Sequence, residues 1–243
     1  MKQIVAGFLL LMLPTVANAQ PADDPAAVQV LDQMSDVIGD LGSCRFTLQI
    51  SRDVDEHDVG LVKRFAVDEV YMVGPDKMRI DTRSDNGHKG YWYDGKNISY
   101  YSYDENNYAT VEAPDTILET IEAVHRDYGV DFPAADFFFP NFTDDLIEGT
   151  DRIVFLGKKM VAGKDCFHVM ASSKSMGIQL WIADDALNLR VKFCITYHDQ
   201  PKAPQYEATF SDWQLNPVLP VAMFDFTAPR TAARLVRKRR CER

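Results

Sequence analysis

The sequence predicts an α+β protein whose main element is a long antiparallel β-sheet. Most segments between Arg45 and Ser211 alternate apolar and polar residues, which is typical of strands with one face in the core and one in water. The links between these segments are short, and strands joined by short turns pair antiparallel. Only two long segments have the spacing of an amphipathic helix. No linker divides this pattern, so we expect one domain over residues 20–229.

The first helix is predicted to begin at Pro25, because Asp24 is a good N-cap residue and proline favours the first helical position. Its apolar residues recur at three- and four-residue steps: Val28, Leu31, Met34, Val37, Ile38 and Leu41. A second helix is expected from Asp115 to Gly129, and its apolar stripe consists of Ile117, Leu118, Ile121, Val124 and Tyr128. A short third helix is expected near Asp144.

The first half of the sheet is predicted to be a series of hairpins. Turn residues occur at Gly74-Pro75-Asp76, Asp94-Gly95 and Asn106-Asn107, and Asp-Gly between alternating segments is a strong hairpin signal. Aromatic residues gather around the second of these turns: Tyr91, Trp92, Tyr93, Tyr100, Tyr101, Tyr103 and Tyr108. We expect them to pack across neighbouring strands. The alternative is a platform for sugars or acyl chains.

The second half is predicted to be a meander of four strands over residues 167–211. Cys166 and Cys194 are expected on two strands of one sheet, with residues 178–182 on the strand between them. Two strand spacings are about 9–10 Å, whereas the Cα atoms of a disulfide lie within about 7 Å. We therefore expect these two cysteines not to pair. The other pairings with Cys44 and Cys241 stay open.

A sheet of about ten strands has an apolar face that must be covered. The two long helices, the short one and the Phe137-Phe138-Phe139 segment are too few to cover it completely. The sheet is therefore expected to roll up on itself or to leave an apolar concavity.

The two ends of the chain differ from the domain. Residues 1–19 have the pattern of a cleaved export signal: a charged start, a short apolar stretch from Ile4 to Leu13, and Ala17-Asn18-Ala19 before Gln20. We therefore expect an exported, periplasmic protein. Residues 230–243 contain seven basic residues and one acid, and we expect a disordered tail. The alternative for this tail is contact with an anionic membrane surface.

Several function classes lack support in the sequence. The net charge of −10 argues against nucleic acid as a partner, because phosphates require a basic face. The sequence contains no motif of a catalytic nucleophile, a zinc site or a nucleotide-binding loop. We therefore expect that the protein is not an enzyme and that it binds no metal or cofactor. The acidic segment Asp53 to Asp58 is interpreted as a solvated hairpin tip rather than a metal site.

Several segments, in their order along the chain, resemble those of a known protein family. These segments are Val73 to Ile80, Trp92 to Lys96, Tyr108, Val161 to Val169, Gln179 to Ala183, Lys192 to Tyr197, Tyr206 to Ala208, Trp213 and Phe224 to Pro229. Together they resemble the predicted periplasmic proteins grouped as domain of unknown function 2092. That family is similar in fold to the lipoprotein carriers LolA and LolB and to the regulator RseB. The resemblance implies a strongly curved, half-open antiparallel barrel, with helices over its concave face and an apolar cavity for acyl chains.

These observations favour a periplasmic binding or carrier protein for a lipid, a lipoprotein acyl chain or a similar amphiphile. Burial of each methylene contributes about 0.8 kcal/mol, so an apolar cavity needs no precise polar constellation. The candidate sheet residues are Leu180, Ile182, Val191, Phe193, Ile195 and Phe210, and the candidate lid residues are Ile117, Leu118, Ile121, Phe137, Phe138 and Phe139. The same side chains could instead form a closed core. The alternative function is a non-catalytic envelope sensor or protein-interaction module of the RseB kind, which binds an envelope protein.

Overall fold

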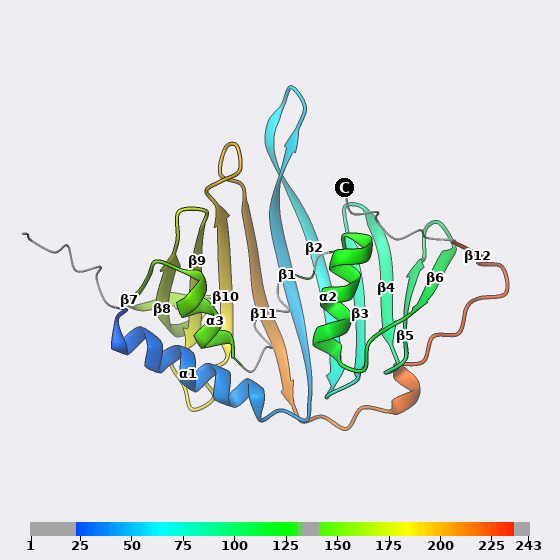
Figure 1. Cartoon of the computed structure of the whole chain (residues 1–243), viewed down its shortest axis with the longest axis horizontal. Helices are drawn as coiled ribbons and strands as arrows, with labels where there is room; N and C mark the ends of the chain where they lie inside the picture. Colours follow the sequence, from blue (N-terminus) through cyan, green and yellow to red (C-terminus); the bar gives the residue numbers. More distant parts are fainter. Residues whose placement is uncertain (1–22, 131, 133–140, 236–243) are drawn as a thin grey trace, which may run out of the picture.

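A computed structural model describes residues 23–130, 132 and 141–235. It confirms an α+β fold built on one curved sheet that does not close into a barrel (Figure 1). The strand order is β12-β6-β5-β4-β3-β2-β1-β11-β10-β9-β8-β7. All neighbouring strands are antiparallel except β12 and β6, which are parallel. The concave face of this sheet is called the inner face below, and the convex face is called the outer face.

Two meanders make up the sheet. The first consists of β1 (Ser43–Glu56), β2 (Gly60–Val73), β3 (Lys77–Ser84), β4 (Gly87–Tyr93), β5 (Asn97–Ser102) and β6 (Asn107–Glu112). The second consists of β7 (Arg152–Val161), β8 (Lys164–Ser172), β9 (Met176–Ala183), β10 (Arg190–Tyr197) and β11 (Gln205–Leu215). Pairing of β1 with β11 joins the two meanders, so the first and last long strands lie side by side at the centre.

The helices lie over the inner face in two groups (Figure 1). Helices α1 (Pro25–Gly39) and α3 (Phe142–Gly149) lie in front of the second meander, whereas α2 (Ile117–Tyr128) lies in front of the first. The Asp24 side chain caps α1 by accepting a hydrogen bond from the Ala26 amide. Thr116 caps α2, and the left-handed conformation of Gly129 ends it. Among the described residues, no helix is both long and apolar enough to cross a membrane.

The predicted cysteine arrangement is confirmed. Cys166 lies on β8 and Cys194 on β10, with β9 paired between them. Cys44, Cys166 and Cys194 are buried free thiols. Cys241 lies outside the described residues.

The hairpin of β1 and β2 extends beyond the rest of the sheet (Figure 1). Its tip contains His57 and Asp58, whose side chains are 92% and 85% exposed, as expected for a solvated acidic turn. On β2, Val70 faces the core, whereas Phe65 and Val67 lie on the outer face and are exposed. Alternation on β2 therefore predicts a strand but does not show which face is buried.

The C-terminal segment crosses the outer face of β4, β5 and β6. A short 3₁₀ helix, Val221–Met223, precedes Phe224, which is buried. The ring of Phe226 packs against Trp92 at 5.0 Å and Tyr108 at 5.8 Å. Strand β12 (Ala233–Arg234) then pairs with β6. The first residues of the basic tail thus belong to the sheet, whereas residues 236–243 lie outside the described part of the chain.

Replacement of Phe226 by alanine should destabilise the protein by about 2 kcal/mol, because it removes a ring that covers three aromatic side chains. Tryptophan emission should shift to longer wavelength as water reaches Trp92. Urea unfolding followed by fluorescence measures both effects. Val218→Ala is the matched control, since Val218 is 99% exposed on the same segment. Equal stability of the two variants would contradict this role of Phe226.

Candidate ligand-binding site

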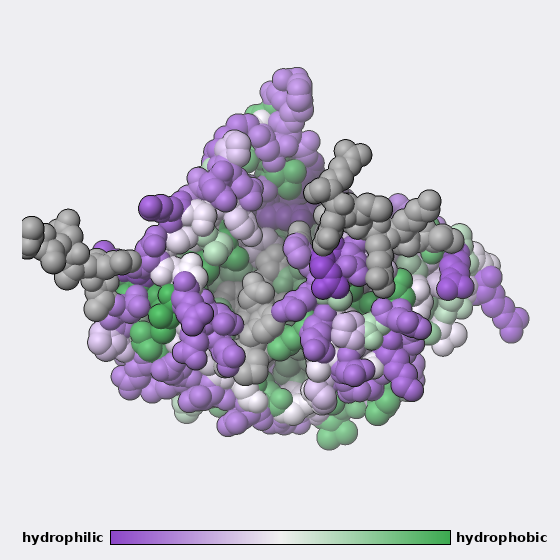
Figure 2. Space-filling model, in the orientation of Figure 1, coloured by the Kyte–Doolittle hydropathy of each residue, from purple (hydrophilic) through white to green (hydrophobic). Residues whose placement is uncertain are grey.

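The inner face is concave, and two groups of helices lie over it (Figure 1). In Figure 2, patches of hydrophobic side chains are visible between these groups, and hydrophilic ones lie above them, below the β1–β2 hairpin. The sheet in this region is formed by the strands at the junction of the two meanders (Figure 1). A concave, largely apolar face is the usual form of a site for apolar ligands.

Five of the six predicted sheet residues come together on the inner face. Leu180, Ile182, Phe193, Ile195 and Phe210 all belong to the main core, and each is at most 9% exposed. Phe193 stacks on Tyr206 at 5.7 Å and contacts Phe210 at 6.0 Å. In this structure these side chains form part of a closed core rather than the wall of an open cavity.

Val191 does not join that group. The register of β10 against β9 shifts between Arg190 and Lys192, which marks a β-bulge. Val191 therefore packs with Cys166 and Ala183 in a separate cluster, apart from Phe193. Simple alternation places Val191 and Phe193 on one face, and the extra residue of the bulge is the reason that this expectation is wrong.

The same bulge brings a charged side chain into the core. Alternation predicts Arg190 on the polar face, but the residue is 1% exposed and its guanidinium lies over the ring of Phe210 at 5.4 Å. Burial lowers the pKa of Arg190 to about 9, an effect that the nearby Cys44 partly opposes. Burial likewise raises the pKa of the Cys44 thiol to about 12. Cys44 is therefore a protonated, unreactive thiol at neutral pH.

The predicted lid is only partly described. Ile117 and Ile121 of α2 are buried in the main core, and Leu118 is half-buried. Phe137, Phe138 and Phe139 lie outside the described residues.

A pocket lies further along α2, between this helix and the inner face of β4, β5 and β6. Its volume is about 60 Å³, and we call it the α2 pocket. It is lined by Tyr91, Ile98, Tyr100, Ala109, Val111, Val124, Tyr128 and Val130. Val124 and Tyr128 continue the helical stripe that starts with Ile117 and Ile121. The apolar face of α2 thus runs from the core into the pocket.

The aromatic residues around the Asp94-Gly95 turn are a partial sequence signal for this pocket, and they divide between the two faces of the sheet. Tyr91 and Tyr100 point inward and line the pocket, and the ring of Phe132 packs edge-on against Tyr91 at 5.4 Å. The outward residues Tyr101 and Trp92 instead pack against Phe226. Tyr91 and Tyr100 also pack against each other across β4 and β5 at 5.5 Å, so the expected cross-strand packing is found on the inner face as well.

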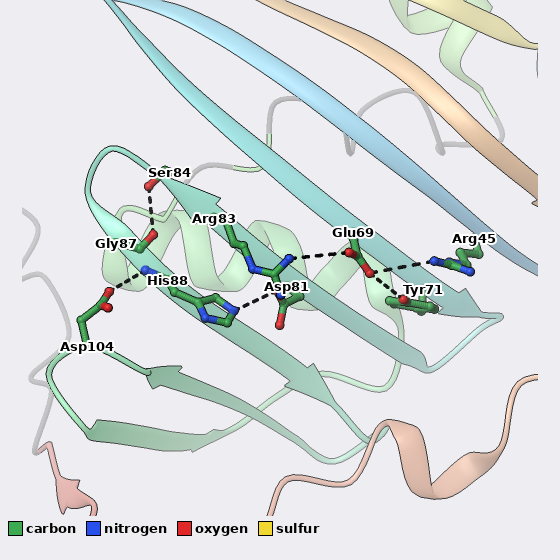
Figure 3. Close-up of polar contacts among 9 residues, drawn as sticks. All are labelled: Arg45, Glu69, Tyr71, Asp81, Arg83, Ser84, Gly87, His88 and Asp104. Atoms are coloured by element: carbon green, nitrogen blue, oxygen red, sulfur yellow. Dashed lines mark hydrogen bonds and ion pairs between the residues drawn. The ribbon is translucent and has the colours of Figure 1, made fainter.

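A polar network lies on the outer face of β1 to β4 (Figure 3). Glu69 accepts a hydrogen bond from the hydroxyl of Tyr71 at 2.9 Å. Asp81 lies 2.9 Å from Nε2 of His88 and 3.6 Å from Arg83. Glu69 also lies 3.9 Å from Arg45 on β1 and 3.9 Å from Arg83 on β3. The network thus links four neighbouring strands, which suits a role in fixing their register.

The contact between His88 and Asp81 has the form of part of a catalytic relay, but it lacks a nucleophile. The His88 ring stacks on Tyr103 at 3.8 Å, and within the described part of the chain no hydroxyl or thiol is hydrogen-bonded to it. The described residues also contain no group of His, Cys, Asp and Glu side chains suited to a metal ion. The network therefore supports the sheet, and the candidate site is on the inner face.

A family model for predicted periplasmic proteins, domain of unknown function 2092, matches residues 27–236. The chain belongs to this family. The match covers the described domain nearly completely and confirms the resemblance seen in the sequence. No curated protein matches the chain.

The chain resembles several solved structures. The chain is similar to an uncharacterized conserved protein from Thermus thermophilus, with 12% identity, a TM-score of 0.51, and coverage of 87% of this chain and 99% of that one. It also matches lipoprotein LppX from Mycobacterium tuberculosis, with 16% identity, a TM-score of 0.45, and coverage of 82% and 100%. A LolA superfamily protein from Nitrosomonas europaea matches with 10% identity, a TM-score of 0.39, and coverage of 82% and 97%.

Proposed function

We propose that this member of the family is a periplasmic binding or carrier protein for a lipid, a lipoprotein acyl chain or a similar amphiphile. The observation that carries the proposal is the α2 pocket. It is open to solvent, is lined by aliphatic and tyrosine side chains, and continues the apolar inner face. Apolar chains bind such surfaces through burial alone.

The size of the pocket defines how binding must proceed. A volume of about 60 Å³ holds about four to six water-sized groups, because about 10–15 Å³ of such volume is enough for one water molecule. Five methylenes contribute about 4 kcal/mol, whereas micromolar affinity requires about 8 kcal/mol. The pocket therefore holds the end of a chain, and a complete ligand requires α2 to separate from β4, β5 and β6. Tyr128 and Val130, at the C-terminal end of α2, are the residues at which this separation would begin.

A pocket-filling variant tests the proposal. Val111→Phe fills the α2 pocket from the inner face of β6 and should weaken uptake of a fluorescent fatty acid at least about tenfold. The matched control is Glu112→Phe, which adds the same ring to the exposed outer face of the same strand. Circular dichroism should show both variants folded. Equal uptake by the two variants would exclude the α2 pocket as the binding site.

Native mass spectrometry of protein purified from the periplasm separates the two functional hypotheses. A carrier should retain a bound lipid mass, whereas an envelope sensor or protein-interaction module should be empty and should not bind the fluorescent probe. The N-terminus of the same material tests the export signal, since we expect it at Gln20. Periplasmic protein that still begins at Met1 would contradict cleavage.

A further inference from the structure

A row of polar side chains borders the α2 pocket on the inner face. In the register of β4, β5 and β6, Lys89 lies opposite Ser102, and Ser102 lies opposite Asn107. Each of the three is two residues along its strand from a side chain that lines the pocket, namely Tyr91, Tyr100 and Ala109. Side chains two residues apart in a strand share a face, and their Cα atoms are about 7 Å apart. The polar row therefore lies directly beside the pocket.

The C-terminal end of α2 lies on the side of this row. The helix is held at its start by the turn between β2 and β3, where the Ile117 amide donates a hydrogen bond to the carbonyl of Pro75. From there α2 runs along the strands (Figure 1). Lys89 is near the other end of these strands, because it pairs with Thr82 on β3. Tyr128, at which α2 would begin to separate from the sheet, is therefore on the side of the pocket that the polar row borders.

Lys89 is a half-buried cation whose ammonium has no ion pair or hydrogen bond among the residues that the structure describes. The acidic side chains of the adjacent turn bind other groups. Asp104 accepts a hydrogen bond from the His88 amide at 2.6 Å, and Glu105 accepts one from the side-chain amide of Asn107 at 2.7 Å. A cation beside an apolar pocket and without its own anion attracts a ligand that brings negative charge.

Asp68 is in the same row, two strands from Lys89, with Thr82 between them. Two strand spacings are about 10 Å, and no ion pair joins the two side chains in the described part of the chain. On the α2 side, Asp127 lies 3.0 Å from Arg126. An anion bound by Lys89 is therefore expected on the β5 side of this lysine, away from the charge of Asp68.

Two polar groups on that side lack partners. Ser102 is 3% exposed, and its Oγ accepts a hydrogen bond from the Glu105 amide at 3.2 Å, which leaves its own proton to donate. The Oδ1 atom of Asn107 is buried and has no hydrogen-bond partner among the described residues. A water molecule that bridges it to a ligand can satisfy this oxygen. Polar groups without partners at the edge of an apolar pocket are typical of a site that a ligand completes.

We propose that Lys89 and Ser102 form the headgroup subsite of the α2 pocket and bind the carboxylate of a fatty acid. An ammonium and a hydroxyl supply donors for the two oxygens of a singly charged group. A phosphate monoester carries nearly twice that charge, and the second negative charge would have no cation here. Arg52, another cation of the inner face, is on β1, three strands from Lys89. This inference rests on the proposed function, since it names the class of ligand for the same pocket.

Competition between ligands of equal chain length tests the subsite. Dodecanoate, dodecanol, dodecyl phosphate and dodecylammonium would each compete with a neutral fluorescent alkyl probe at pH 7.5, below their micellar concentrations. Wild-type protein should bind dodecanoate at least about tenfold more tightly than dodecanol, because a hydrogen bond to a charged group contributes that much. It should bind dodecyl phosphate no more tightly than dodecanoate. General attraction cannot produce a preference for an anion, since the chain has a net charge of −10.

Two substitutions of Lys89 and a matched control assign the preference to this residue. Lys89→Met keeps an unbranched stem without the charge, so dodecanoate and dodecanol should bind equally. Lys89→Glu should reverse the preference, so that dodecylammonium binds more tightly than dodecanoate. Lys96→Glu makes the same change of charge in the exposed turn at the other end of the β4–β5 hairpin and should keep the wild-type preference.

Equal affinity of wild-type protein for dodecanoate and dodecanol, or a preference that survives Lys89→Met, would overturn the subsite and leave the carrier function intact. Loss of the preference in Lys96→Glu would assign it to overall charge and would also overturn the subsite. Tighter binding of dodecyl phosphate than of dodecanoate would overturn the choice of a carboxylate. If the probe does not bind to wild-type protein and none of the compounds binds either, the carrier function fails and the subsite fails with it.

Discussion

Replacement of Phe193 by aspartate should prevent the protein from folding. Phe193 is fully buried between Tyr206 and Phe210, so the substitution removes a core ring and places a carboxylate among apolar side chains. Loss of the ring costs about 3–5 kcal/mol and the buried charge adds several more. The sum reaches the whole stability of a typical domain, about 5–15 kcal/mol. Far-UV circular dichroism, a melting curve and the amount of protein in the periplasm measure the effect.

Phe193→Leu is the control, because it keeps an apolar side chain in the core and should cost less than loss of the whole side chain, about 3–5 kcal/mol. A folded Phe193→Asp protein that no longer takes up a fluorescent fatty acid would place Phe193 on the wall of an open cavity. A folded variant that still takes up the probe would contradict both the core position and a role in binding.

Replacement of Asp68 by asparagine should stabilise the protein at neutral pH. The folded protein raises the pKa of Asp68 from its usual 3.8 to about 6, mainly through burial, so folding disfavours the ionised form. A difference of about two pKa units corresponds to about 3 kcal/mol at pH 7.5. The melting temperature of Asp68→Asn should therefore rise by about 5–10 °C at that pH.

The size of this effect depends on pH. Below about pH 3 the carboxyl is protonated in both the folded and the unfolded chain, so the variant should gain nothing there. Between pH 4 and pH 6 the unfavourable contribution of Asp68 grows, and above pH 6 it is fully present. Melting curves of both proteins from pH 4 to pH 8 check this. A destabilised variant at pH 7.5 would show that the Asp68 carboxylate has a partner that holds the fold together.

Local sequence patterns predict the elements well where the cause is local. Asp24 and Pro25 fix the start of α1, and Gly129 ends α2, because caps depend on a few neighbouring backbone groups. The Asp94-Gly95 turn and the short links likewise predict antiparallel pairs, which the β4–β5 pair confirms.

Features that depend on the partner strand are harder to predict from the sequence. Alternation of apolar and polar residues predicts a strand but does not show which of its faces is buried. On β2, for example, Phe65 is exposed while Val70 is in the core. The bulge that turns Val191 away from Phe193 arises from the pairing of β10 with β9 and has no signal in β10 alone. The α2 pocket cannot be predicted from local sequence patterns for the same reason, since it depends on how α2 lies against β4, β5 and β6.

The central pair of β1 and β11 has a consequence for how the chain folds. Within each meander, strands pair with their neighbours in sequence, so these contacts can form early and locally. The β1–β11 pair instead joins Leu48 to Phe210 and closes a loop that contains nearly the whole domain. One edge of β1 therefore stays unpaired until the last long strand, β11, is available to pair with it. An unpaired strand edge can pair with another chain, so aggregation competes with folding at this edge.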